Sequence, residues 1–174
     1  MFNLKKMKFF IICLLVIFNC NDSTGSDTNP ETHHHDSVHV YNSAPITIPH
    51  NAYTPIAFDS ERIDLNDMHD MTNPGRLLAK KTGLYLIIVK LAFAHDPNGS
   101  RGIYIMQNNA RYIAVEEKYA LAFNFTTFNL TTSAYLTEND YVNIRVYQDS
   151  GGDLDIVKPG TEKWSPEFMM TLIE

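Results

Sequence analysis

The chain has 174 residues, of which 44% are hydrophobic and 20% are charged, and its formal net charge is -6. This length fits one domain with or without a tail, and the composition excludes a fully disordered chain, a collagen and a coiled coil. Two cysteines cannot form a disulfide scaffold. The acidic balance, without a basic patch, argues against nucleic acid as a partner.

Residues 1–20 have the layout of an export signal. Lys5, Lys6 and Lys8 precede an apolar run at 9–18 that is interrupted only by Cys13. The run suits a signal peptide and is too short to span a bilayer, which takes roughly 20 residues. A buried N-terminal helix or strand, the alternative, would not usually be followed by so long a polar stretch. Removal of the signal takes away three lysines and no acid, leaving 11 basic against 20 acidic residues. We therefore expect an acidic protein that is secreted or held at the cell surface.

Both cysteines lie in this first segment, so residues 21–174 must fold without a disulfide. Cys20 stands where the apolar run ends, a position that resembles the acylated cysteine of a bacterial lipoprotein. Phe18 and Asn19 are larger than the residues usual before such a cysteine. Two outcomes stay open: a lipid anchor on Cys20, which would be the protein's one link to a membrane, and simple cleavage by signal peptidase.

Residues 21–43 are rich in Asp, Ser, Thr, Asn and His and have almost no large aliphatic side chains. Such a stretch cannot bury enough surface to offset its ordering entropy, so we expect a flexible polar spacer. Its histidines, 33–35 and His39, could bind a transition metal opportunistically. A flexible tract lacks the fixed geometry of a metal site, which favours the plain spacer.

From residue 44 to 174 short alternating apolar runs are separated by clusters of Gly, Pro, Asn and Asp, and no window keeps a helical period. This pattern predicts an all-β sandwich or barrel. The expected strands lie near residues 45–48, 52–58, 76–80, 83–94, 101–107, 110–116, 121–136, 140–148, 153–157 and 167–173.

Three turns are expected between these strands. Residues 107–110 predict a tight hairpin, because Asn108 and Asn109 tolerate positive φ. The segments 96–99 and 150–152 contain the Pro, Asn and Gly residues that favour turns.

Two of the expected strands, 83–89 and 168–173, are apolar on both faces. An antiparallel sandwich buries one face of each sheet, so the second apolar face needs another partner. A covering loop or a second subunit could supply it. Large apolar surfaces on exported proteins usually mark interfaces, which favours self-association.

Residues 44–174 resemble the globular head domain of complement C1q and its bacterial relatives, within the tumour-necrosis-factor-like jelly-roll superfamily. Single motifs are short, but their order and spacing run through the whole domain. The matching segments are 58–61, 67–70 with 73–77, Gly83-Leu84-Tyr85, 140–142 with 146–148, 151–152 and 165–168.

The resemblance implies a ten-stranded antiparallel jelly roll that assembles as a homotrimer. In that family the Gly-x-Tyr strand and the last strand lie toward the trimer axis, as the doubly apolar strands suggest for this chain. The aromatic candidates for the trimer interface are Tyr85, Tyr141, Tyr147 and Phe168. Their alternative role is packing inside the core of one subunit.

Two acidic clusters are candidates for a cation site. Asp67, His69 and Asp70 share a loop, where they could bind a hard cation such as calcium or act as an acid–base pair. A hydrogen-bonded loop in which Arg76 pairs with a carboxylate is the favoured alternative. Asp153 and Asp155 are a second candidate pair. Neither cluster defines a full ligand set, so we expect no cofactor, with a structural calcium ion left open.

An enzyme is disfavoured. Residues 149–152 (Asp-Ser-Gly-Gly) and His95 are similar to protease segments, but the domain is too small for a double barrel. A turn explains Gly151 and Gly152 better, and a triad is defined by geometry.

We therefore expect an exported, non-enzymatic binding module that recognises a protein, glycan or surface ligand multivalently. The loops would make the contacts, with Arg62, Arg101 and Arg111 as candidate polar residues. A structural trimerisation cap and, less favoured, a small hydrolase are the alternatives.

Overall fold

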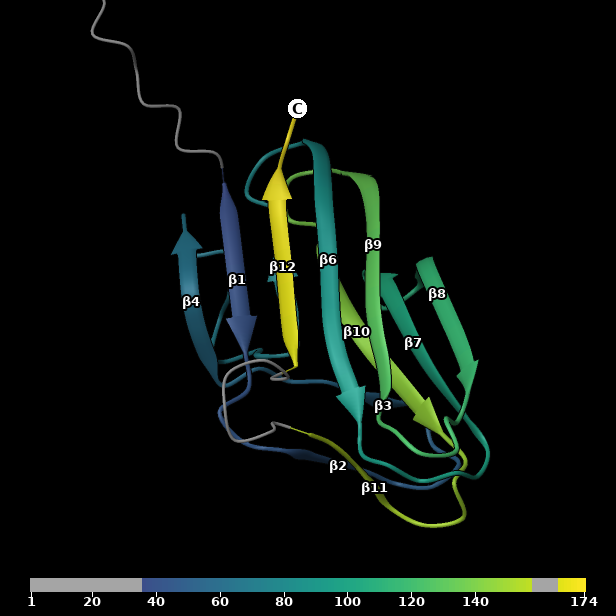
Figure 1. Cartoon of the computed structure of the whole chain (residues 1–174). Helices are drawn as coiled ribbons and strands as arrows, with labels where there is room; N and C mark the ends of the chain where they lie inside the picture. Colours follow the sequence, from purple (N-terminus) through teal and green to yellow (C-terminus); the bar gives the residue numbers. More distant parts are fainter. Residues whose placement is uncertain (1–35, 158–165) are drawn as a thin grey trace, which may run out of the picture. The chain divides into compact units, whose positions relative to one another are not determined.

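The computed structural model describes residues 36–157 and 166–174. These residues form twelve strands and no helix, arranged as two antiparallel sheets (Figure 1). The all-β prediction is confirmed. Within the described ranges no helix is long and apolar enough to cross a membrane. The predicted signal peptide and Cys20 lie outside the described residues.

The larger sheet, sheet A, is built around β6, its longest strand together with β9. Across the sheet the order is β4-β1-β12-β6-β9, and one end of β6 also pairs with β11, which pairs with β2. Its strands are β1 (Ser37–Tyr41), β2 (Ile46–Ile48), β4 (Ser60–Leu65), β6 (Gly83–Phe93), β9 (Thr126–Leu136), β11 (Leu154–Ile156) and β12 (Glu167–Leu172).

The smaller sheet, sheet B, has the order β3-β10-β7-β8, and β5 shares with β3 the outer edge of β10. Residues 141–143 of β10 pair with β5, and residues 145–146 pair with β3. Between the two, the Ile56 amide donates to the Ile144 carbonyl at 3.0 Å. The strands are β3 (Thr54–Pro55), β5 (Arg76–Leu78), β7 (Ser100–Gln107), β8 (Arg111–Tyr119) and β10 (Tyr141–Gln148).

The core lies between the sheets and follows the two-residue period of the strands. In β10, Val142, Ile144 and Val146 are fully buried, as their alternation predicts. From sheet A, Phe168 enters the same core, where its ring lies 5.7 Å from that of Phe58. This packing fixes which side chains of each strand face outward.

The predicted hairpin at 107–110 is confirmed. Asn108 and Asn109 have φ of 51° and 58°, and the Ala110 amide donates to the Gln107 carbonyl at 3.0 Å. The turns near 96–99 and 150–152 also form, with positive φ at Gly99 and Gly151. Asparagine and glycine occupy these positions because other side chains are strained there.

The predicted boundary between spacer and domain is wrong. Residues 37–41, placed in the spacer, form β1 between β12 and β4. Val38 and Val40 are fully buried, while His39 lies on the outer side of the strand. The polar composition of 21–43 as a whole conceals the alternation of polar and apolar residues in 37–41. Residues 33–35 lie outside the described part.

Two further strand predictions needed correction. The expected strand at 52–58 is only the two residues of β3, and the unpredicted β4 follows it. The segment 121–125 precedes β9 as a loop, in which the Asn124 side chain accepts a hydrogen bond from the Phe125 amide at 2.8 Å. The two unpredicted strands, β1 and β4, make the domain twelve-stranded rather than ten-stranded.

Candidate functional site

The first acidic cluster is a hydrogen-bonded loop. Asp70 accepts hydrogen bonds from the Thr72 amide at 2.8 Å, the Thr72 hydroxyl at 2.6 Å and the Asn73 side chain at 3.3 Å. The bonds from Thr72 and Asn73 lower the pKa of the Asp70 carboxyl. Asp67 is exposed, with a φ of 52°. Loop hydrogen bonds therefore account for the Asp70 carboxylate. The expected ion pair between Arg76 and a carboxylate of this loop does not form. The Arg76 guanidinium donates instead to the side-chain oxygen of Asn73.

His69 serves the loop rather than a ligand. Its side chain is buried, with Nδ1 2.8 Å from Glu61 Oε1 and Nε2 3.3 Å from the Pro74 carbonyl oxygen. Its amide and that of Met68 donate to the Asp64 carboxylate at 3.0 and 2.8 Å. Both ring nitrogens thus face protein acceptors.

The second acidic pair is also not gathered around one point. Asp155 accepts a hydrogen bond from the Thr47 hydroxyl at 2.7 Å, and Asp153 is exposed before β11. Across 36–157 and 166–174, no three His, Cys, Asp or Glu side chains come together as metal ligands would.

Two of the four aromatic interface candidates are wrong. Tyr85 and Phe168 are fully buried in the core of a single chain, so neither has surface to give to a neighbour. The Tyr85 hydroxyl donates to the Lys81 carbonyl at 2.8 Å. Tyr141 and Tyr147 lie half-buried on the outer side of β10, and their interface role stays a prediction.

Ser150 and His95, the protease-like residues, each form hydrogen bonds with other groups and not with one another. The Ser150 hydroxyl bonds to the Gln148 side-chain oxygen at 2.7 Å and to the Gly152 carbonyl at 3.0 Å. His95 Nε2 lies 3.0 Å from the Ala122 carbonyl oxygen. These contacts assign Ser150 to its turn and His95 to the loop before β9.

Of the three arginines predicted to contact a ligand, Arg101 is fully buried, so that prediction is wrong. Its guanidinium donates to the carbonyl oxygens of Asn98 at 2.9 Å and Ser100 at 2.8 Å, which fixes the turn before β7. Arg62 lies 3.3 Å from Glu167, and Arg111 is exposed.

Apolar side chains gather on the outward side of sheet A, where polar residues such as Ser37, Thr171 and Ser133 lie among them. The register aligns Ile63, His39, Met169, Ile88 and Thr131 in one row across five strands. We call this surface the apolar face of sheet A and define it by Ile63, Leu65, Leu84, Leu86, Ile88, Tyr135, Met169 and Ile173. The predicted double-sided apolarity of β6 is confirmed, because Tyr85, Ile87 and Val89 fill the core from its other side.

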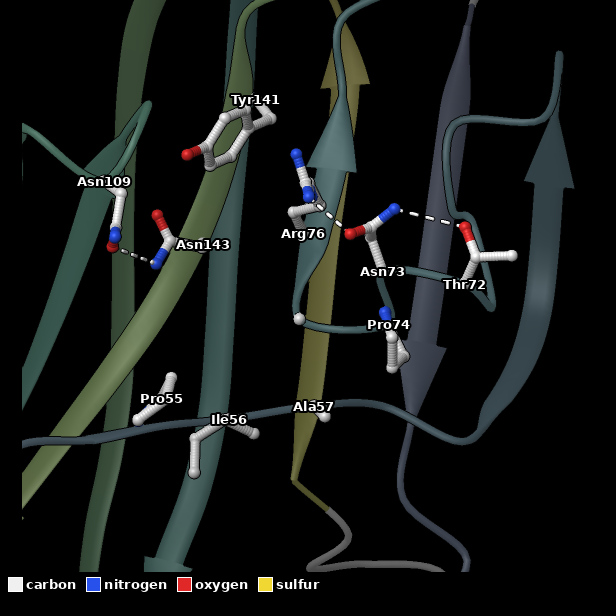
Figure 2. A pocket seen from close by; sticks show the side chains of 11 residues that line it. Pro55, Ile56, Ala57, Thr72, Asn73, Pro74, Arg76, Asn109, Tyr141 and Asn143 are labelled. Carbon is white, nitrogen blue, oxygen red and sulfur yellow. Dashed lines mark hydrogen bonds between the residues drawn. The ribbon is translucent and has the colours of Figure 1, made fainter.

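A pocket lies on the opposite sheet, at the gap between β5 and β3 along β10. It has a volume of about 410 Å³ and is open to solvent. Figure 2 shows three groups around it: β10 and the 107–110 hairpin, β5 with the loop before it, and the segment after β3. Its lining residues are Pro55, Ile56, Ala57, Thr72, Asn73, Pro74, Gly75, Arg76, Asn109, Tyr141 and Asn143.

Two close approaches build the pocket walls. The Phe58 amide donates to the Pro74 carbonyl at 2.9 Å, joining the segment after β3 to the loop before β5. A Cβ on Gly75 would lie 3.1 Å from the Ile56 carbonyl oxygen, so glycine permits this contact.

The orientation of Asn143 in this pocket follows from its neighbours. Arg145 Nη2, which can only donate, lies 2.7 Å from Asn109 Oδ1. The same oxygen accepts from Asn143 Nδ2 at 3.3 Å. Asn143 must therefore turn its nitrogen toward Asn109, and its oxygen faces the Tyr141 side of the pocket (Figure 2). That oxygen is buried, in a residue 7% exposed, and has no hydrogen-bond partner within the described residues.

Arg76 supplies the positive charge of the pocket. Its guanidinium lies 4.7 Å from the centre of the Tyr141 ring, and Nη2 donates to Asn73 Oδ1. The Tyr141 ring and Asn73 thus hold the cation against the strand, while further N–H groups of the same guanidinium can serve a ligand.

Sequence reasoning found parts of this pocket for other reasons. Asn109 belonged to the predicted hairpin, Tyr141 to the proposed interface, and Arg76 to the acidic loop. No sequence pattern distinguishes Asn143, because polar residues are common on the outer side of a strand. Only the pairing of β10 with β5 brings these residues together.

Comparisons with known proteins give the fold. No family model matches the chain, and no curated protein matches it. Among solved structures, the globular domain of zebrafish complement 1qA has a TM-score of 0.57 at 15% identity, over 80% of this chain and 98% of that one. Eiger TNF from S. frugiperda has a TM-score of 0.58 at 12% identity, over 80% and 93%. Murine APRIL has a TM-score of 0.59 at 11% identity, over 80% and 99%. The chain therefore contains a C1q/TNF-like jelly-roll domain, as its sequence motifs predicted.

Proposed function

We propose that this chain is an exported, non-enzymatic binding module whose domain assembles as a homotrimer and recognises its ligand multivalently. The apolar face of sheet A is the observation that carries this proposal. Ile63 and Tyr135, at opposite edges of that face, are 50% and 65% exposed, with half-buried Leu86, Ile88 and Met169 between them. Exposed and half-buried apolar side chains gathered on one face in this way mark an interaction site.

A second copy of the chain is the proposed occupant. The resemblance to C1q heads implies threefold assembly through the side of the domain that contains β6 and β12. Assembly would place three copies of every outer surface on one particle and raise the avidity of weak single sites.

The mass of the exported protein in solution tests this assembly. Light scattering after size exclusion should give three times the mass of one chain. Ile63→Asp and Tyr135→Asp should each shift the mass toward one chain, because each places a charge in the interface. Val115→Asp is the matched control, since Val115 is 49% exposed but lies on β8 of sheet B. A wild-type monomer would overturn the trimer and favour a covering segment over β6.

The other parts of the proposal have separate tests. Cell fractionation tests export, and fatty-acid labelling of the wild type and of Cys20→Ser distinguishes a lipid anchor from simple cleavage. A trimer that binds no glycan, lipid or protein would identify a structural cap. Hydrolysis that disappears in Ser150→Ala would be needed to restore the enzyme alternative.

A further inference from the structure

The pocket between β3 and β5 contains a hydrogen-bond acceptor that the fold does not use. Arg145 and Asn109 fix the Asn143 amide so that its oxygen faces the pocket. A buried acceptor without a donor destabilises a fold, and an apolar side chain of similar size would avoid that cost. The Asn143 oxygen is therefore a group that a ligand can satisfy.

We propose that this pocket binds a saccharide through two neighbouring hydroxyl groups. One hydroxyl donates to Asn143 Oδ1, and the other accepts from the guanidinium of Arg76. The inference rests on the proposed binding function and deepens it by naming a ligand class. It needs one chain only, so it does not depend on the trimer.

The lining chemistry favours hydroxyl groups over ions. Among the described lining residues none is a carboxylate, so a cation finds no counter-charge, and an ammonium group would face Arg76. An anion alone could pair with Arg76 but would repel the Asn143 oxygen. A hydroxyl both donates and accepts, so neighbouring hydroxyls can serve the Asn143 oxygen and the Arg76 guanidinium together.

Shape and apolar lining favour a sugar ring over a peptide. The volume of about 410 Å³ lies in the range of small-ligand pockets, roughly 300–1,000 Å³. Pro55, Pro74 and Ala57 give an aliphatic wall against which the C–H side of a pyranose can pack. A peptide chain would need a longer groove or a free strand edge, and β10 is already covered by β5 and β3.

Ligand-observed saturation-transfer NMR on the exported protein tests this site. The probes are methyl α-mannoside, methyl β-galactoside and galacturonic acid at millimolar concentration, with N-acetyl-dialanine methylamide as the peptide probe. We expect saturation transfer to at least one of the two neutral glycosides and none to the peptide. Transfer to galacturonic acid alone would show recognition of its carboxylate rather than of hydroxyl groups and would overturn the proposal.

Two variants locate the binding. Asn143→Ala removes the acceptor and leaves Asn109 bonded to Arg145, and Arg76→Gln removes the charged donor. Each should abolish the saturation transfer while the unfolding midpoint stays close to that of the wild type. Asn129→Ala, an exposed amide on β9 of the other sheet, is the matched control and should bind as the wild type does.

The outcomes separate this inference from the trimer proposal. No transfer to any of the three saccharides, transfer to the peptide instead, or transfer that persists in both variants would overturn it. Loss of sugar binding with an unchanged trimeric mass in both variants supports the pocket. A monomeric protein that still binds the sugar would overturn the trimer alone.

Discussion

Gln148, the last residue of β10, is a fully buried amide with every hydrogen bond filled. Its nitrogen donates to the Ile48 carbonyl at 3.0 Å and the Gly152 carbonyl at 2.8 Å. Its oxygen accepts from the Ser150 amide at 2.8 Å and the Ser150 hydroxyl at 2.7 Å. This one side chain connects β10, β2 and the turn before β11. Gln148→Leu should therefore weaken three segments at once.

The expected loss is about 3 kcal/mol of unfolding free energy. Leucine keeps most of the volume but leaves the buried Ile48 carbonyl without its side-chain donor, at a cost of about 1–3 kcal/mol. The Ser150 and Gly152 groups are closer to solvent, so water can replace part of their bonds, and they add about 1 kcal/mol together. Against a total stability of about 5–15 kcal/mol, this change is large.

Equilibrium unfolding in urea measures this difference. The midpoint should fall while the dependence on denaturant stays constant. Asn143→Leu is the matched control, because it also replaces a buried amide in β10 but breaks one bond of 3.3 Å and removes an acceptor that the described protein leaves unsatisfied. It should change stability by less than about 1 kcal/mol. Equal losses in the two variants would refute the hydrogen-bond argument for both residues.

Phe168→Ala should cost about 4 kcal/mol of stability, because it empties a fully buried site; a change in trimer mass with unaltered unfolding would show an interface role instead. Gly99→Ala should lower the melting temperature, since Gly99 has a φ of 72° and a Cβ would meet Asp149. Burial lowers the pKa of His39 below 6.5 despite Glu167, so the unfolded chain binds a proton that the folded chain resists. Stability should thus fall as pH drops below 6.5, and His39→Gln should flatten that slope in unfolding measured across this range.

The period of two residues explains why most of the sheets could be predicted. In 141–148 the alternating side chains separate a core side from an outer side, so both the strand and its orientation follow from the sequence. In 83–93 the apolar run predicts the strand but not its orientation. The hairpin at Asn108 and Asn109 could be predicted for a different reason, because few residues accept positive φ.

Other features depend on partners that sequence does not specify. β1 is short and surrounded by polar residues, so its pairing with β12 and β4 makes it a strand. The pattern of β6 shows two apolar sides but not which one meets its own core, and Tyr85 was therefore assigned to the wrong surface. The pocket joins Asn109 to Asn143, 34 residues apart, and its acceptor depends on the position of Arg145. No local pattern contains that information.

The two ends of the described domain lie side by side. The Leu172 amide donates to the Asp36 carbonyl at 2.9 Å, and the loops at 94–99, 120–125 and 149–153 lie at the opposite end (Figure 1). A reporter protein fused at either terminus would therefore leave those distal loops uncovered. A short linker from Glu174 to Asp36, with new termini opened in 120–125, would give a circular permutant. Tethered to a support through its new termini, this permutant would expose the end of the domain that now holds Asp36 and Glu174.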